Sequence, residues 1–153
     1  MRAEQIKHFA LDLFAKKGYE GTSLEDIAKG VGIKKPSIYS HYSGKDVLFL
    51  QIVKDVFDEE TQYIYHFFDN NANLPLESRL YRILYQYKER FEDDEKLRFL
   101  IRMMFFPPPH LYEEILTVYV YPLLDCWESQ LITLFRKATK ENLISPIDPE
   151  IAA

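Results

Sequence analysis

A run of basic and hydroxyl-bearing side chains between residues 34 and 45 has the composition of a nucleic-acid contact surface. The run contains three lysines and one histidine, and no aspartate or glutamate falls between Asp26 and Asp46. Lysine side chains can bind the phosphates of DNA, and short polar side chains can reach base edges in a groove. The candidate DNA-binding residues of this run are Lys34, Lys35, Ser37, Tyr39, Ser40, His41 and Lys45.

Two short helices joined by a tight turn would present these side chains, and residues 22–45 predict such a helix-turn-helix. Thr22 and Ser23 each have an acidic residue three positions later, so either register makes a capping box. Gly32 suits a turn that needs positive φ, and Pro36 suits the first turn of the second helix. The residues expected to pack inward are Ile27, Ala28, Ile38 and Tyr42.

The distribution of charge favours the same surface. The chain of 153 residues has a net charge of −5, but residues 1–47 carry +2 and the other 106 residues carry −7. Positive charge is therefore local to the helix-turn-helix. The acidic remainder discourages DNA from binding elsewhere on the molecule.

Composition narrows the class of protein. No apolar run approaches the ~18 residues of a membrane span, and the N-terminus lacks the continuous apolar segment of a signal peptide. The single cysteine, Cys126, excludes a disulfide within the chain and suits a reducing compartment. We therefore predict a cytoplasmic protein with no membrane partner.

Hydrophobic periodicity predicts an all-α fold. Apolar residues at helical spacing predict an amphipathic helix over residues 3–17, with Gly18 as its stop. A long helix should begin at Lys45 and end near residues 69–71. Later helices are expected from residue 75, from the acidic run 92–95 to just before Pro107, and over 110–140 with an interruption at Pro122. The apolar face expected for the helix after residue 75 consists of Leu76, Leu80, Ile83, Leu84, Tyr87 and Phe91.

These elements predict two domains, a helix-turn-helix domain over 1–46 and a helical effector-binding and dimerisation domain over 47–153. Asn142 can end the last long helix in a left-handed conformation. Asp148, Pro149 and Glu150 then resemble the start of another helix, which the chain does not complete. We therefore expect the sequence to be a piece of a longer protein.

Catalysis finds little support in the sequence. There is no glycine-flanked serine elbow, phosphate-binding glycine loop or dinucleotide fingerprint. His110, Glu113 and Glu114 share one helical face and could bind a metal, but a solvated acidic first turn is the favoured interpretation. We predict no enzyme activity, no catalytic residues, no metal and no cofactor.

Aromatic residues are concentrated in the second domain, where 18 of the 23 lie beyond residue 47. Side chains of this kind can line an apolar ligand pocket between helices, although helical spacing favours simple core packing for any one of them. The candidate ligand-binding residues are Phe67, Tyr85, Phe99, Met103, Phe106, Tyr119 and Trp127. They predict a hydrophobic or aromatic effector.

With these elements placed, residues 1–50 resemble the three-helix head of the TetR family of bacterial transcriptional regulators. The residues that carry the resemblance are Phe14, Gly18, Tyr19, Thr22, Ile27, Ala28, Gly32, Ile38, Tyr39, Tyr42 and Lys45. The later part of the chain is similar only in helix order and in short phrases such as RMMFFPP. Two departures are Lys34, where the family often has a capping serine, and Tyr42, where phenylalanine is commoner.

The resemblance implies a homodimer that binds a roughly palindromic operator, usually as a repressor, and that a small molecule releases. It also implies two final dimerisation helices, which this sequence lacks. By position it assigns Thr22, Tyr39, His41 and Lys45 mainly to the DNA backbone, and Lys35, Pro36 and Ser37 to the major groove. Ser40 suits either role. The alternative is a TetR-like scaffold that acts mainly through protein–protein interaction, with DNA as an anchor.

Overall fold

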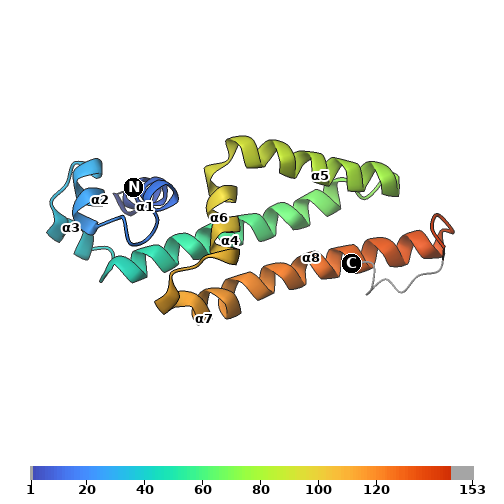
Figure 1. Cartoon of the computed structure of the whole chain (residues 1–153). Coiled ribbons are helices and arrows are strands. Elements are labelled where there is room, and N and C mark those ends of the chain that lie inside the picture. The colour runs from blue at the N-terminus through green and yellow to red at the C-terminus, as the bar shows by residue number, and fades with distance from the viewer. Residues whose placement is uncertain (1, 146–153) are drawn as a thin grey trace.

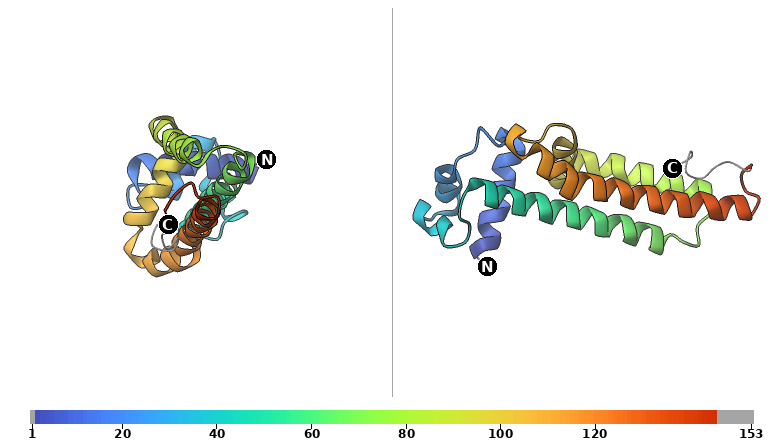
Figure 2. Two further views of the ribbon diagram at one scale, coloured as in Figure 1. Left: turned by 90° about the vertical axis from the view of Figure 1, so that its right-hand side faces the viewer. Right: turned by 90° about the horizontal axis from the view of Figure 1, so that it is seen from below.

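A computed structural model of the protein describes residues 2–145, and every regular element in that range is helical, as predicted. In chain order the elements are α1 (Arg2–Lys17), α2 (Leu24–Val31), α3 (Lys35–Tyr39), α4 (Lys45–Asn70), α5 (Leu76–Asp93), α6 (Glu95–Phe105), the 3-10 turn η1 (Pro109–Leu111), α7 (Tyr112–Ile115), the π-helical turn η2 (Leu116–Val120) and α8 (Tyr121–Lys140). The first three helices form a head at one end of the molecule (Figure 1). Helix α4 leads from the head into the body, where α5 and α8 run beside it (Figure 2). The helix start predicted at Asp148 lies outside the described residues.

The head is built on α1, whose buried face packs against α2 and α4. Ile6, Ala10 and Phe14 are almost completely buried on this face, in agreement with the predicted helical stripe. The ring of Phe9 lies directly over Gly30, so that a β-carbon at residue 30 would stand 1.8 Å from it. A glycine at this position therefore allows α1 and α2 to approach closely.

One hydrophobic cluster continues from the head into the body. It begins at Ile6 in α1, runs along the buried face of α4 and reaches Leu134 in α8. Helix α6 also packs against both α1 and α4, so the head contacts the body through two helices. The division into domains at residue 46 remains a prediction.

The face that α5 buries agrees with the predicted apolar stripe at four of its six positions. Ile83 is buried, and Leu76, Leu80 and Tyr87 are partly buried against the core. Leu84 and Phe91 are instead 71% and 48% exposed, so the prediction was wrong about these two residues. The same face carries Arg79, which is buried, and Arg90, which meets Glu60 of α4, a partner that apolar periodicity cannot reveal.

The last long helical stretch is interrupted as predicted. The π-helical turn η2 ends at Val120 and runs directly into α8, where Pro122 lies in the first turn and has no N–H to donate to the preceding turn. After α8, Asn142 has φ 54°, so it ends the helix in the predicted left-handed conformation. None of the helices within residues 2–145 is both long and apolar enough to cross a membrane.

Candidate nucleic-acid interface

Helix α2 begins at a capping box in the second of the two possible registers. The Ser23 hydroxyl oxygen accepts a bond from the backbone N–H of Asp26 at 3.1 Å, and the Asp26 carboxylate accepts from the backbone N–H of Ser23 at 3.3 Å. The hydrogen bond from the Ser23 side chain also holds the pKa of Asp26 below its usual value. These bonds satisfy N–H groups that a helix start leaves unpaired, so they fix where α2 begins.

The turn between α2 and α3 depends on Gly32, which has φ 73°. Its N–H donates to the carbonyl oxygen of Lys29 at 3.1 Å, and the N–H of Ile33 donates to that of Ala28 at 2.9 Å. A β-carbon at residue 32 would meet no atom within 4 Å, so the glycine serves the backbone conformation rather than close packing. The turn sets the direction in which α3 leaves the head.

Helix α3 is a short element held by one buried side chain. Ile38 is fully buried, while Lys35, Pro36 and Ser37 in its first turn are exposed. Lys34 precedes the helix in an extended conformation and its side chain makes no cap bond, while the N–H of Ser37 donates to the Lys34 carbonyl oxygen at 2.8 Å. The helix ends at Tyr39, earlier than the prediction that placed Tyr42 on its inward face.

Tyr42 is nevertheless buried, as expected, because the chain continues to turn after the helix. The N–H of Tyr42 donates to the carbonyl oxygen of Ile38 at 2.9 Å, and its hydroxyl donates to that of Ala3 in α1 at 3.3 Å. These contacts tie the end of α3 back to α1. They leave Ser40 and His41 exposed.

The predicted DNA-contact residues from Lys34 to His41 thus lie at the surface of the head. Tyr39 is 50% exposed, and the other six residues are exposed as well. No acidic residue belongs to this segment. We name the exposed residues of this segment the α3 face: Lys34, Lys35, Pro36, Ser37, Tyr39, Ser40 and His41.

Lys45 lies at the start of α4, where an aromatic ring supports it. Its Nζ stands 3.9 Å from the centroid of the Tyr19 ring. The Tyr19 hydroxyl donates to the Asp46 carboxylate, which lowers the pKa of Asp46, and His110 Nε2 lies 3.5 Å from the same carboxylate. This cluster joins the head, α4 and η1 beside a predicted phosphate contact. Sequence reasoning missed it because Tyr19, Asp46 and His110 are far apart in the chain.

Thr22 requires a correction. Its side chain is 1% exposed, and the hydroxyl donates to the carbonyl oxygen of Gly18 at 2.9 Å. Its N–H is also used, donating to the carbonyl oxygen of Tyr19 at 3.2 Å. The structure therefore gives Thr22 a role inside the head, at the link from α1 to α2, and contradicts a direct phosphate contact by its side chain.

None of the seven predicted ligand-binding residues lines any of the cavities described for residues 2–145, so their role in ligand binding stays a prediction. The buried members are Phe67, Phe99 and Met103, the exposed members are Tyr85 and Phe106, and Tyr119 and Trp127 are partly buried. Helical spacing alone cannot distinguish a core side chain from one at a pocket wall.

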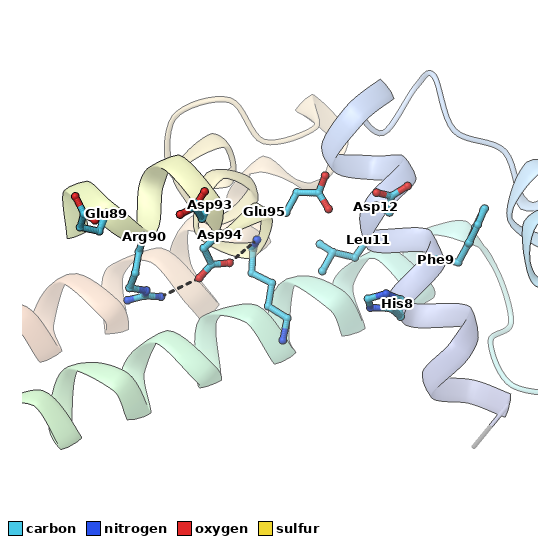
Figure 3. Close-up of a pocket in the computed structure, with 10 residues that line it drawn as sticks. His8, Phe9, Leu11, Asp12, Glu89, Arg90, Asp93, Asp94 and Glu95 are labelled. Atoms are coloured by element: carbon cyan, nitrogen blue, oxygen red, sulfur yellow. Dashed lines mark hydrogen bonds and ion pairs between the residues drawn. The ribbon is translucent and has the colours of Figure 1, made fainter. Parts of the chain in front are cut away.

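Two cavities among residues 2–145 have walls of a different character. The first, of about 630 Å³, lies between α1 and the corner where α5 meets α6, and most of the residues that line it are charged (Figure 3). His8 and Asp12 of α1 face Asp93 and Glu95 across it. The second, of about 540 Å³, lies between α4, the start of α5 and α8. Both walls contain charged residues, which a prediction based on aromatic side chains does not include.

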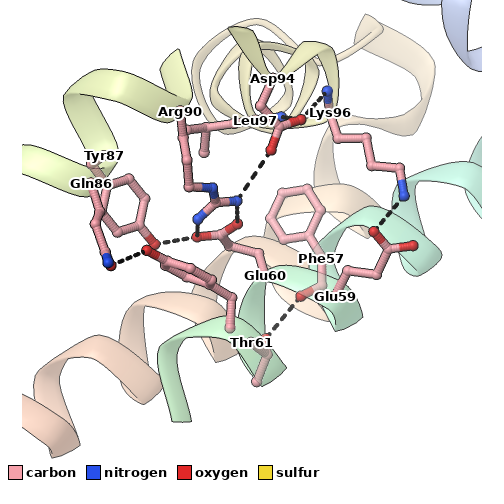
Figure 4. A network of polar contacts seen from close by, with 11 residues as sticks. Phe57, Glu59, Glu60, Thr61, Gln86, Tyr87, Arg90, Asp94, Lys96 and Leu97 are labelled. Atoms are coloured by element: carbon pink, nitrogen blue, oxygen red, sulfur yellow. Dashed lines mark hydrogen bonds and ion pairs between the residues drawn. The ribbon is translucent and has the colours of Figure 1, made fainter. Parts of the chain in front are cut away.

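A buried polar network connects α4 to α5 near the first cavity (Figure 4). The Arg90 guanidinium donates to both oxygens of Glu60, from Nη1 at 3.2 Å and from Nη2 at 2.6 Å. The Tyr87 hydroxyl donates to the same carboxylate, and Arg90 lies 3.9 Å over the ring of Tyr63. Burial and the hydrogen bond to Glu60 raise the pKa of Tyr87. Arg90 also reaches Asp94 at 3.4 Å, so the network extends to the start of α6.

No metal-binding arrangement was found within residues 2–145, where no group of three or more histidine, cysteine, aspartate or glutamate side chains can hold an ion. His110 lies beside Asp46, whereas Glu113 and Glu114 are exposed, as the solvated-acid interpretation expected. Cys126 is buried, and burial raises the pKa of its thiol.

Comparison with known proteins adds independent evidence. Residues 7–52 match the family described as bacterial regulatory proteins, tetR family. IcaR of Staphylococcus epidermidis, the negative transcriptional regulator of the biofilm operon icaADBC, is 34% identical over 112 residues, or 73% of this chain. The chain spans 58% of the length of that relative.

Two solved structures share the fold. A TetR/AcrR-family transcriptional regulator from Thermobifida fusca matches with a TM-score of 0.69 and 22% identity, covering 99% of this chain and 77% of that one. The regulator FadR of Bacillus subtilis, solved with stearoyl-CoA, matches with a TM-score of 0.70 and 17% identity, covering 97% and 77%. These proteins and IcaR are transcriptional regulators rather than enzymes, which agrees with the prediction that this chain is not an enzyme.

Proposed function

Because the chain belongs to the TetR family of bacterial transcriptional regulators, we propose that it acts as a sequence-specific DNA-binding repressor. In this proposal two copies bind a roughly palindromic operator, and a small-molecule effector releases them. The relative IcaR is named a negative regulator, which favours repression over activation.

The observation that carries the proposal is the α3 face. It combines exposed cations and exposed hydroxyls at the start of a helix, with no carboxylate in the segment. In helix-turn-helix proteins, the N-terminal residues of the second helix contact base edges in the major groove. We therefore assign Lys35, Pro36 and Ser37 to the bases, and assign Lys34 with Tyr39, His41 and Lys45 to phosphates. Ser40 can serve either role.

Binding of duplex DNA at several salt concentrations tests this assignment. A library of random duplexes first yields a preferred sequence by repeated selection. Lys35→Ala should then weaken binding to that sequence and relax preference at one base position, costing about 1–3 kcal/mol if Lys35 reads a base. Lys88→Ala on α5 is the matched control, because Lys88 is also exposed but lies outside the head. A Lys35→Ala protein that retains full sequence preference would refute the base-reading role.

The body is the proposed site for the effector. FadR was solved with stearoyl-CoA, an acyl thioester with a long apolar chain, and it shares this fold. This supports a ligand with an apolar portion, in line with the expectation of a hydrophobic or aromatic effector. A thermal-shift screen that finds only hydrophilic binders would count against it.

Helix α4 is the proposed transmission element. Its first residue, Lys45, belongs to the DNA-contact set, and Asp55 further along pairs with Lys7 of α1. Movement of α4 therefore moves the head. A dimer must hold its two recognition helices about 34–36 Å apart to match successive major grooves. A tilt of α4 that changes this separation by a few ångströms therefore weakens operator binding.

Thermodynamic linkage gives this mechanism a strict test. If an effector weakens operator binding, the operator must weaken effector binding by the same factor. Effector affinity measured with and without operator duplex should therefore differ. Equal affinities would exclude release through coupled binding.

A further inference from the structure

The cavity of about 540 Å³ lies at the end of the body opposite the head. The last residues of α4, the first turns of α5 and the C-terminal half of α8 meet there, in both Figure 1 and Figure 2. Its wall includes Tyr65 and Phe68 from α4, Arg79 from α5, and Leu134 and Lys137 from α8. It is thus a mixed apolar and cationic cavity.

Arg79 is a buried cation without a carboxylate partner. It is 7% exposed, and among the ion pairs of residues 2–145 none includes it. Its Nη2 donates to the carbonyl oxygens of Ala72 and, at 3.3 Å, Leu74, but its buried Nε has no hydrogen-bond partner. Buried charges in proteins are normally paired, as Glu60 is with Arg90, so the guanidinium lacks an anion that a ligand can supply.

A second cation adds to the positive character of this cavity. Lys137 is exposed on α8, and its Nζ lies 3.8 Å from Glu141, a surface pair one turn away. Such exposed pairs are weak, so Lys137 can turn toward a ligand at little cost. His66 and the single acid Asp69 also line the wall, which leaves one net positive charge with the histidine neutral.

Apolar surface adjoins the two cations. Arg79, Leu134 and Lys137 also line a smaller cavity of about 50 Å³, whose other walls include Leu76 and Ala138. A ligand with its charged group at Arg79 can therefore place an apolar chain against Phe68 and Leu134. We propose that this cavity binds a small organic anion, such as a carboxylate with an apolar chain, through Arg79 and Lys137.

The inference rests on the proposed function only in treating this anion as the effector. Binding itself can be measured without DNA, because Trp127 is the only tryptophan and its ring centroid lies 6.0 Å from that of Phe68 in the cavity wall. Trp127 fluorescence should therefore report titration of the whole chain with octanoate. Octanol and octylamine, which is cationic at neutral pH, serve as probes of equal chain length.

We expect octanoate to bind at least about tenfold more tightly than octanol, the contribution of one or two charge-assisted hydrogen bonds, with octylamine weakest. Arg79→Met should remove this preference while leaving octanol affinity unchanged. Arg82→Met is the matched control on the same helix, because Arg82 donates to Asn71 at 2.9 Å and does not line the cavity. It should keep the preference for octanoate.

Loss of Arg79 can also destabilise the loop whose carbonyls it binds, so Lys137→Met provides a second variant at an exposed position. It should weaken octanoate binding severalfold in a folded protein. Equal affinity of the wild-type chain for octanoate and octanol, or no octanoate binding at all, would overturn the proposal. The proposal would also fail if Lys137→Met left the affinity for octanoate unchanged. It would fail likewise if Arg82→Met lowered octanoate affinity as much as Arg79→Met does.

The experiment separates this inference from the proposed function. Octanoate binding that depends on Arg79 but leaves operator binding unchanged supports the anion site and contradicts its role as the effector site. Failure of the wild-type chain to bind any duplex contradicts the proposed function and leaves the Trp127 titration as evidence for the site.

Discussion

Removing Arg90 should destabilise the protein more than removing its partner Glu60. Glu60 is 4% exposed, and Arg90 is the only cation bound to it among residues 2–145. In Arg90→Met the carboxylate keeps the hydroxyl of Tyr87 but has no cation in the interior. Breaking a buried pair in this way costs about 3–5 kcal/mol in the free energy of unfolding. For a chain of this size that corresponds to a Tm lower by on the order of 10 °C.

Removal of the carboxylate instead, by Glu60→Gln, should lower the free energy of unfolding by a smaller amount. After Glu60→Gln the Arg90 side chain, which is 24% exposed, still reaches Asp94 at 3.4 Å and still stacks on Tyr63. Solvent and these two partners stabilise the remaining cation, so we expect a loss of about 1–2 kcal/mol. The difference in the free energy of unfolding between the two single variants reflects the deeper burial of the carboxylate relative to the guanidinium.

Urea unfolding followed by circular dichroism provides the measurement. The double variant Glu60→Met with Arg90→Met removes both charges and should be more stable than Arg90→Met alone, since an apolar pair can replace a buried ion pair at little cost. A loss below about 1 kcal/mol in Arg90→Met, or no recovery in the double variant, would refute the reasoning.

Four changes in the head give further predictions. Gly32→Ala should lower the free energy of unfolding by about 1–2 kcal/mol, measured by urea unfolding, because φ is 73° there although space is open. Ser23→Ala removes one cap bond and should cost about 1 kcal/mol by the same measurement. Thr22→Val should cost about 1 kcal/mol but leave the salt dependence of DNA binding unchanged, since its hydroxyl is buried. Lys34→Ala should reduce the slope of log affinity against log salt by about one, measured by fluorescence anisotropy of a labelled duplex.

Local signals in the sequence were sufficient to predict the head. The cap at Ser23, the turn at Gly32 and the first-turn proline Pro36 each act within a few residues, so their consequences can be worked out without knowing the fold. Exposure of the α3 face followed from the same pattern. Thr22 was assigned wrongly because its hydroxyl bonds to Gly18, a contact that competes with a role at the surface.

The body was less predictable because its polar contacts join distant parts of the chain. Glu60 and Arg90 are 30 residues apart, and nothing near either one indicates that both turn inward. Leu84 was predicted on the apolar face of α5 yet is exposed, whereas Ile83 beside it is buried on the face that carries Arg90. Helix order can be predicted from periodicity, but the rotation of each helix about its axis depends on its partners.

Helix α4 brings the three parts of the proposed mechanism onto one rigid element. Lys45 begins it in the head, Glu60 fixes its middle to α5, and Phe68 near its end lines the proposed anion cavity. At about 1.5 Å per residue its 26 residues extend ~39 Å, so a small rotation about the Glu60 contact displaces both ends in opposite directions. An anion that draws Arg79 and Lys137 together beside Phe68 would therefore move Lys45 as well. An effector can release the operator through this motion only if it binds one orientation of α4 more tightly than the other. An effector that binds both orientations equally well cannot release the operator.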